Sequence, residues 1–71
     1  MDSKENIIVK RTEDNFIVTP ESNYKSYISD ERKMLYFDKV NGFESFQDVT
    51  DYLIQYFNID KENIIIIDEN K

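Results

Sequence analysis

Four short runs of β-branched and aromatic residues constrain the fold of this chain more than any other feature of its sequence. The runs are Ile7-Ile8-Val9, Phe16-Ile17-Val18-Thr19, Met34-Leu35-Tyr36-Phe37 and Ile64-Ile65-Ile66-Ile67. Residues of these types favour strands, and polar turn residues separate the runs. The sequence therefore predicts four strands. Residues 24–29, which mix apolar and polar side chains on both faces, are the candidate for a fifth.

A single stretch of the chain has the period of a helix. Ser45 is suited to the N-cap, and Asp48 stands where it can close a capping box. The apolar stripe falls within about 80° of Phe46 on a helical wheel, and it consists of Phe46, Val49, Thr50, Leu53, Tyr56 and Phe57. Asn58 is expected to end the helix in the left-handed conformation, with Ile59 as its hydrophobic contact.

Together these elements predict one α+β domain over residues 1–71. We expect an antiparallel β-meander of four to five strands with one helix packed on one face, in the order β-β-(β)-β-α-β. Pro20 closes the second strand, with loop to residue 23, because proline cannot donate to the ladder of a central strand. Asn41-Gly42 favours positive φ and a tight reversal after the predicted strand that contains Met34 to Phe37.

The predicted elements do not cover the two faces of the predicted sheet equally. Side chains alternate along a strand, so each of the four runs places apolar residues on both faces. The single helix can cover one face, and the other then needs a different cover. Three possibilities are open: the sheet curls around that face, loops cover it, or another protein or a second copy of the chain does.

Composition excludes several classes of function. The chain has no histidine, no cysteine and one glycine, so it lacks the usual general base, the common transition-metal ligands and a glycine-rich phosphate loop. We expect no enzyme, no cofactor and no metal site. A formal net charge of −6 opposes direct nucleic-acid binding. The apolar runs are too short to cross a membrane, and the first residues lack the apolar stretch of a signal peptide, which favours a cytoplasmic protein.

The outer face of the predicted helix is the main candidate binding surface. Acidic and amide side chains and one tyrosine gather there, and they are Glu44, Asp48, Asp51, Tyr52 and Gln55. Tyrosine is common at protein interfaces, and carboxylates favour a partner with a basic surface. The alternative is a self-associating structural domain, such as a homodimer, that pairs through an apolar sheet face or an edge strand.

In size, acidity and lack of catalytic side chains the chain resembles small inhibitors made by viruses and mobile elements against nucleic-acid enzymes. Anti-CRISPR and anti-restriction proteins are examples. The resemblance is one of composition. It implies a non-enzymatic inhibitor whose carboxylates occupy a basic nucleic-acid-binding groove of a partner protein.

Overall fold

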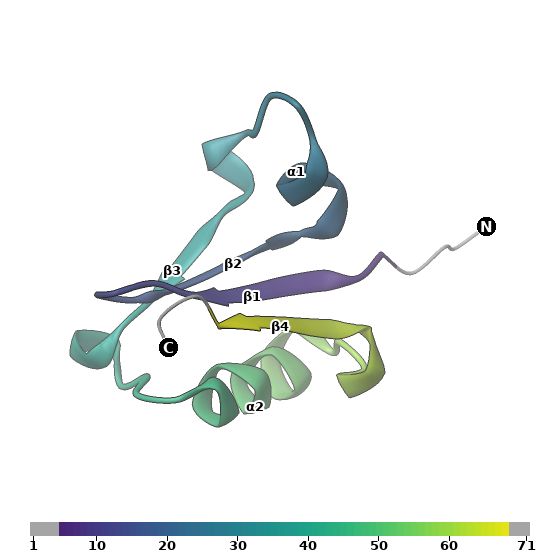
Figure 1. Cartoon of the computed structure of the whole chain (residues 1–71). Coiled ribbons are helices and arrows are strands. Elements are labelled where there is room, and N and C mark those ends of the chain that lie inside the picture. Colours follow the sequence, from purple (N-terminus) through teal and green to yellow (C-terminus); the bar gives the residue numbers. More distant parts are fainter. Residues whose placement is uncertain (1–4, 69–71) are drawn as a thin grey trace.

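A four-stranded mixed sheet forms the centre of the structure, a computed structural model that describes residues 5–68 (Figure 1). Its strands are β1 (Ile7–Arg11), β2 (Phe16–Pro20), β3 (Leu35–Phe37) and β4 (Ile64–Asp68). They lie in the order β3-β2-β1-β4. The four strands predicted from the apolar runs are therefore present, with the third shorter than expected.

The predicted antiparallel meander is only partly right. β2 is antiparallel to both β1 and β3, but β4 lies parallel to β1, with Val9 in register with Ile66. After β3 the chain passes along one face of the sheet as a helix before it enters β4 beyond β1 (Figure 1). This passage brings β4 in at the far edge and in the direction of β1, as crossover connections do.

The long helix α2 (Phe46–Phe57) confirms the predicted caps. The Ser45 hydroxyl accepts from the Asp48 backbone N–H at 3.3 Å, and the Asp48 carboxylate accepts from the Ser45 N–H at 3.2 Å. Asn58 ends the helix in the left-handed conformation, with φ of 56°. α2 packs on one face of the sheet to form the core, whose buried members are Val9, Phe16, Val18, Phe37, Val49 and Leu53.

The region after Pro20 contradicts the prediction of a loop followed by a fifth strand. It forms a short helix, α1 (Glu21–Lys25), in which the Lys25 ammonium pairs with the Glu21 carboxylate at 3.0 Å. The buried Asn23 side chain explains why the following residues do not extend into a strand. Its amide donates to the Asp30 carbonyl at 3.1 Å, and its oxygen accepts from the Asp30 N–H at 2.7 Å.

α1 and the turn behind it cover part of the sheet face opposite α2 (Figure 1). Ile8 and Thr19 on that face are each 2% exposed. Farther along the same face Ile17 and Ile67 are half-buried, and Tyr36 is 51% exposed. Cover by the chain itself, one of the three possibilities left open by the sequence, therefore accounts for one end of this face and not for the other.

Candidate functional site

Four of the five predicted binding residues lie on one exposed surface. Glu44 precedes α2, and Asp48, Asp51 and Gln55 project from its outer side; all four are exposed. α2 contains no lysine or arginine, whereas Glu44 shares the lining of a pocket with Arg11 and Lys39. The placement of Asp48, Asp51 and Gln55 on the outside of the helix agrees with the helical wheel.

Tyr52 does not lie on that surface. It is half-buried, and its ring packs edge-on against Phe37 and Phe43 at centroid distances of 5.4 and 5.3 Å. The prediction of an outward-facing Tyr52 was wrong because the aromatic rings of β3 and the following loop reach up to this flank of α2. Conversely Tyr56, predicted in the core stripe, is 66% exposed.

The two helix carboxylates already have hydrogen-bond partners within their own helix end. Asp48 accepts from the backbone N–H groups of Glu44 and Ser45, and Asp51 accepts from the Gln47 side-chain amide at 2.8 Å. The helix dipole also stabilises a carboxylate at this N-terminal end of α2. Substitution of Asp48 would therefore weaken α2 itself, whereas Asp51 and Glu44 can be changed without removing a cap.

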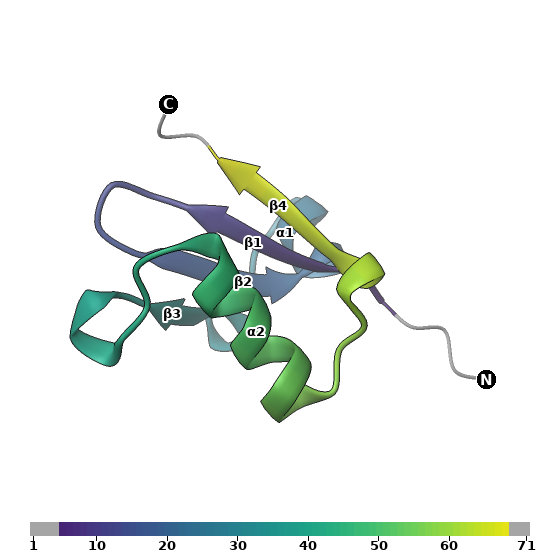
Figure 2. The same ribbon diagram turned by 90° about the horizontal axis from the view of Figure 1, so that it is seen from below.

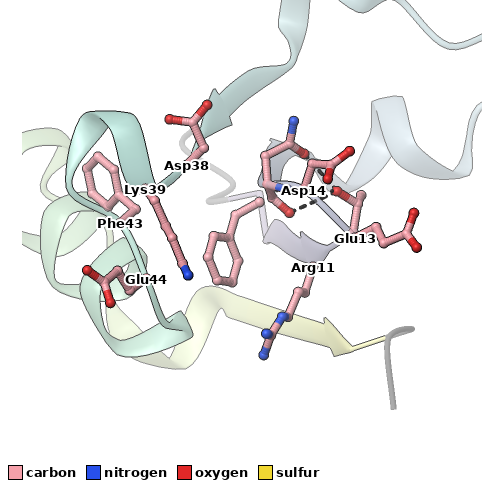
Figure 3. Close-up of a pocket in the computed structure, with 10 residues that line it drawn as sticks. Arg11, Glu13, Asp14, Asp38, Lys39, Phe43 and Glu44 are labelled. Atoms are coloured by element: carbon pink, nitrogen blue, oxygen red, sulfur yellow. Dashed lines mark hydrogen bonds between the residues drawn. The ribbon is translucent and has the colours of Figure 1, made fainter.

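A small pocket lies between the β1–β2 turn and the loop after β3. Its volume is about 60 Å³, and Phe16 is among the residues that line it. Figure 3 shows acidic and basic side chains spread around it rather than converging on one point; those labelled include Arg11, Asp38 and Glu44. Small-molecule sites usually measure about 300–1,000 Å³, so this pocket suits water rather than a metabolite.

Neither shifted pKa values nor groups of metal-ligating side chains indicate a further candidate site in the described part of the chain. Hydrogen bonds from Lys25 and Asn6 lower the pKa of Glu21, and those from Arg32 lower the pKa of Asp30. Both carboxyl groups belong to α1 and the turn behind it. Among residues 5–68 no three potential metal-ligating side chains form a group, and no helix is long and apolar enough to cross a membrane.

The outer edge of β4 is an apolar strand edge at the border of the sheet. No strand within residues 5–68 pairs with this edge, and Ile64 to Ile67 carry neither a charge nor a proline that would blunt it. Seen from below, α2 lies over the middle of the sheet and leaves β4 uncovered (Figure 2). Ile66, which faces the α2 side, is consequently 50% exposed.

A groove runs between α2 and β4 beside this edge. It has a volume of about 150 Å³, and its lining is mostly apolar; the residues are Phe46, Gln47, Thr50, Lys61, Ile64 and Ile66. We call the outer edge of β4 together with this groove the β4 edge site. The run of isoleucines was visible in the sequence, but its position at the border of the sheet was not.

The Thr50 hydroxyl in this groove is buried without a hydrogen-bond partner. A buried unpaired polar group destabilises a fold by about 1–3 kcal/mol. We therefore expect Thr50→Val to raise the free energy of unfolding by about 1 kcal/mol, since the methyl group removes the unpaired hydroxyl at similar volume. Urea unfolding monitored by circular dichroism checks this, and a clear loss of stability would show that the hydroxyl is bonded in solution.

Comparison of the chain with protein-family models, with curated proteins and with solved structures found no match.

Proposed function

We propose that this protein is a non-enzymatic protein-binding module whose docking surface is the β4 edge site. The observation that carries the proposal is an edge strand that begins with four isoleucines, one of them the half-exposed Ile66, and whose outer side pairs with no strand among residues 5–68. Edges of this kind are normally shortened, charged or covered, because they pair with other chains. An unprotected edge is therefore a surface that a partner would cover.

Strand addition is the binding mode that fits this surface. An extended segment laid along β4 would pair with backbone N–H and C=O groups on its outer side, over a length of about 17 Å for five residues. Alternate side chains of that segment would point to the α2 side, next to the groove lined by Phe46 and Ile64. The remaining side chains would meet the half-buried Ile65 and Ile67 on the opposite face.

Charge around the β4 edge site favours a partner that carries basic residues beside its apolar strand. Asp60 and Glu62 are exposed just before β4, on either side of Lys61, which lines the groove. The whole chain has a net charge of −6. Electrostatic complementarity of this type speeds encounter and excludes acidic partners.

Affinity capture with matched variants tests the proposal. The wild-type chain, Ile66→Lys and the control Val40→Lys serve as baits in an extract of the native source. Val40 is 92% exposed in the turn Lys39–Asn41, so the control adds the same charge elsewhere. We expect Ile66→Lys to reduce capture of a bound protein at least about ten-fold, since a charge in the paired edge opposes strand addition, and Val40→Lys to leave it unchanged. Equal capture by all three baits would contradict the proposal.

The acidic face of α2 supports a second candidate, namely an inhibitor that occupies the basic surface of a nucleic-acid-binding protein. It rests on the exposed Glu44, Asp51 and Gln55 and on the absence of any base in α2. In that case capture would weaken steeply with salt and fail for Asp51→Lys, while the exposed control Asp14→Lys would bind normally. Capture that is insensitive to Asp51→Lys would exclude this candidate.

A further inference from the structure

We infer that Asn41 is a site of spontaneous covalent modification, at which attack by the Gly42 backbone converts the asparagine to aspartate and isoaspartate. An asparagine followed by glycine occurs only here in the sequence. The pair lies in the connection between β3 and α2, at the end of the turn Lys39–Asn41. The inference is independent of the β4 edge site, which is on another part of the chain.

The surroundings of Asn41 and Gly42 leave room for this reaction. Both residues are exposed. Gly42 is in the left-handed conformation with φ of 92°, and a Cβ placed on it would have no atom within 4 Å. A side chain on this residue would hinder the approach of its nitrogen to the preceding side chain, and glycine has none. The structure therefore sets no steric barrier around the reacting pair.

Hydrogen bonds at the surface of the molecule hold the turn in its native form. The Gly42 N–H donates to the Lys39 carbonyl at 3.0 Å, and the Asn41 side-chain amide donates to the Asp38 carboxylate at 2.9 Å. A single 3₁₀ turn has poorer hydrogen-bond geometry than an α-helix, and exposed loops open locally far more often than the core does. Local opening frees the Gly42 nitrogen to reach the Asn41 side chain.

The reaction needs water and no other reactant. The Gly42 backbone nitrogen attacks the side-chain carbonyl carbon of Asn41, and a C–N bond forms. The side-chain nitrogen leaves as ammonia and takes the proton that the Gly42 nitrogen loses, so a cyclic imide remains. Water then breaks one of the two C–N bonds of the imide ring. Cleavage at the side-chain carbonyl gives aspartate, and cleavage at the backbone carbonyl gives isoaspartate.

Both products disrupt the native turn. A carboxylate at position 41 cannot donate to the Asp38 carboxylate, and the two like charges repel each other at this distance. Isoaspartate also adds a methylene group to the backbone, which displaces the residues that follow. Among them is Phe43, whose N–H donates to the Asp38 carbonyl at 2.9 Å. We therefore expect the modified turn to lose this backbone hydrogen bond.

Phe43 connects the turn to the packed part of the molecule. Its ring lies edge-on to Phe37 of β3 and to Tyr52 of α2, at centroid distances of 4.7 and 5.3 Å. Aromatic pairs in this arrangement stabilise a fold beyond the area that they bury. Modification of Asn41 therefore loosens one of the contacts that join β3 to α2, and it does so gradually as the protein ages.

Hydrogen exchange of the purified isoaspartate form tests the structural consequence. We expect the Phe43 amide to exchange at least about ten-fold faster than in the unmodified chain, because its bond to the Asp38 carbonyl is lost. The amides of β1, which lies in the middle of the sheet, should not change. Equal exchange of the Phe43 amide in both forms would show that the modification leaves the turn intact and would overturn this part of the inference.

Mass spectrometry of the aged chain tests the modification itself, and Asn58 is the matched control within the same molecule. Asn58 is also exposed, but isoleucine follows it. After incubation in mildly alkaline buffer, we expect Asn41 to lose its amide at least about ten-fold faster than Asn58, since the Ile59 side chain hinders attack by its own nitrogen. Asn41→Gln, which would need a larger ring, should abolish the fast loss. Equal rates at Asn41 and Asn58 would overturn the inference.

Discussion

Replacing Leu53 with alanine is expected to remove about 2–5 kcal/mol from the free energy of unfolding. Leu53 is 1% exposed and lies in the core between α2 and the sheet. Truncation removes its contacts and leaves a cavity that close-packed neighbours fill only in part. Natural domains are stable by only about 5–15 kcal/mol, and small ones lie at the low end. The variant should therefore be substantially unfolded at temperatures where the wild type is folded.

Thermal and urea unfolding followed by circular dichroism measure this effect. Ile54→Ala is the matched control, because Ile54 is the next residue of the same helix and is 38% exposed. It should lose about 1 kcal/mol or less, in keeping with its partial burial. Equal losses for the two variants would show that α2 does not pack on the sheet through the Leu53 side.

Replacing Asn23 with alanine is expected to remove about 2–3 kcal/mol, since three buried or part-buried hydrogen bonds disappear together. Asn23 is 5% exposed. Its amide donates to the Thr19 hydroxyl at 2.9 Å and to the Asp30 carbonyl, and its oxygen accepts from the Asp30 N–H. The alanine variant leaves the Asp30 backbone groups and the Thr19 hydroxyl without these partners, and it frees the turn that helps to cover Ile8.

Hydrogen exchange separates this local effect from global unfolding. The amides of α1 and of Asp30 should lose protection first, while those of α2 should follow the global loss of stability. Ser22→Ala, at an exposed position in the same short helix, is the control and should change stability by about 0.5 kcal/mol or less. Unchanged protection at Asp30 in the Asn23 variant would contradict the role given to this side chain.

The elements that were predictable are those encoded by local signals. The strands follow from β-branched runs, and α2 follows from a 3.6-residue apolar period with Ser45 and Asn58 as caps. The position of β4 beside β1 depends on contacts between residues far apart in the chain, which no local run specifies. α1 was missed because its stability comes from the buried Asn23, whose partner Asp30 is seven residues away.

The candidate site was predictable to a similar extent. The helical wheel placed Asp48, Asp51 and Gln55 correctly on the outside, since these residues meet only solvent and their own helix end. It misplaced Tyr52, because a helical wheel contains no information about contacts with other elements. Phe37 and Phe43 extend the core toward that flank of α2. The groove beside β4 arises from where α2 crosses the sheet, which is a property of packing rather than of sequence pattern.

Amide hydrogen exchange of β4 in the free chain and in the complex with its captured protein tests most directly whether its outer edge binds another chain. The backbone N–H groups of Ile64–Asp68 that face outward should exchange at least about ten-fold more slowly in the complex, as strand pairing buries them. The amides of the inner strand β2 should not change. Exchange in β4 that is the same in the free chain and in the complex would contradict pairing at the β4 edge site.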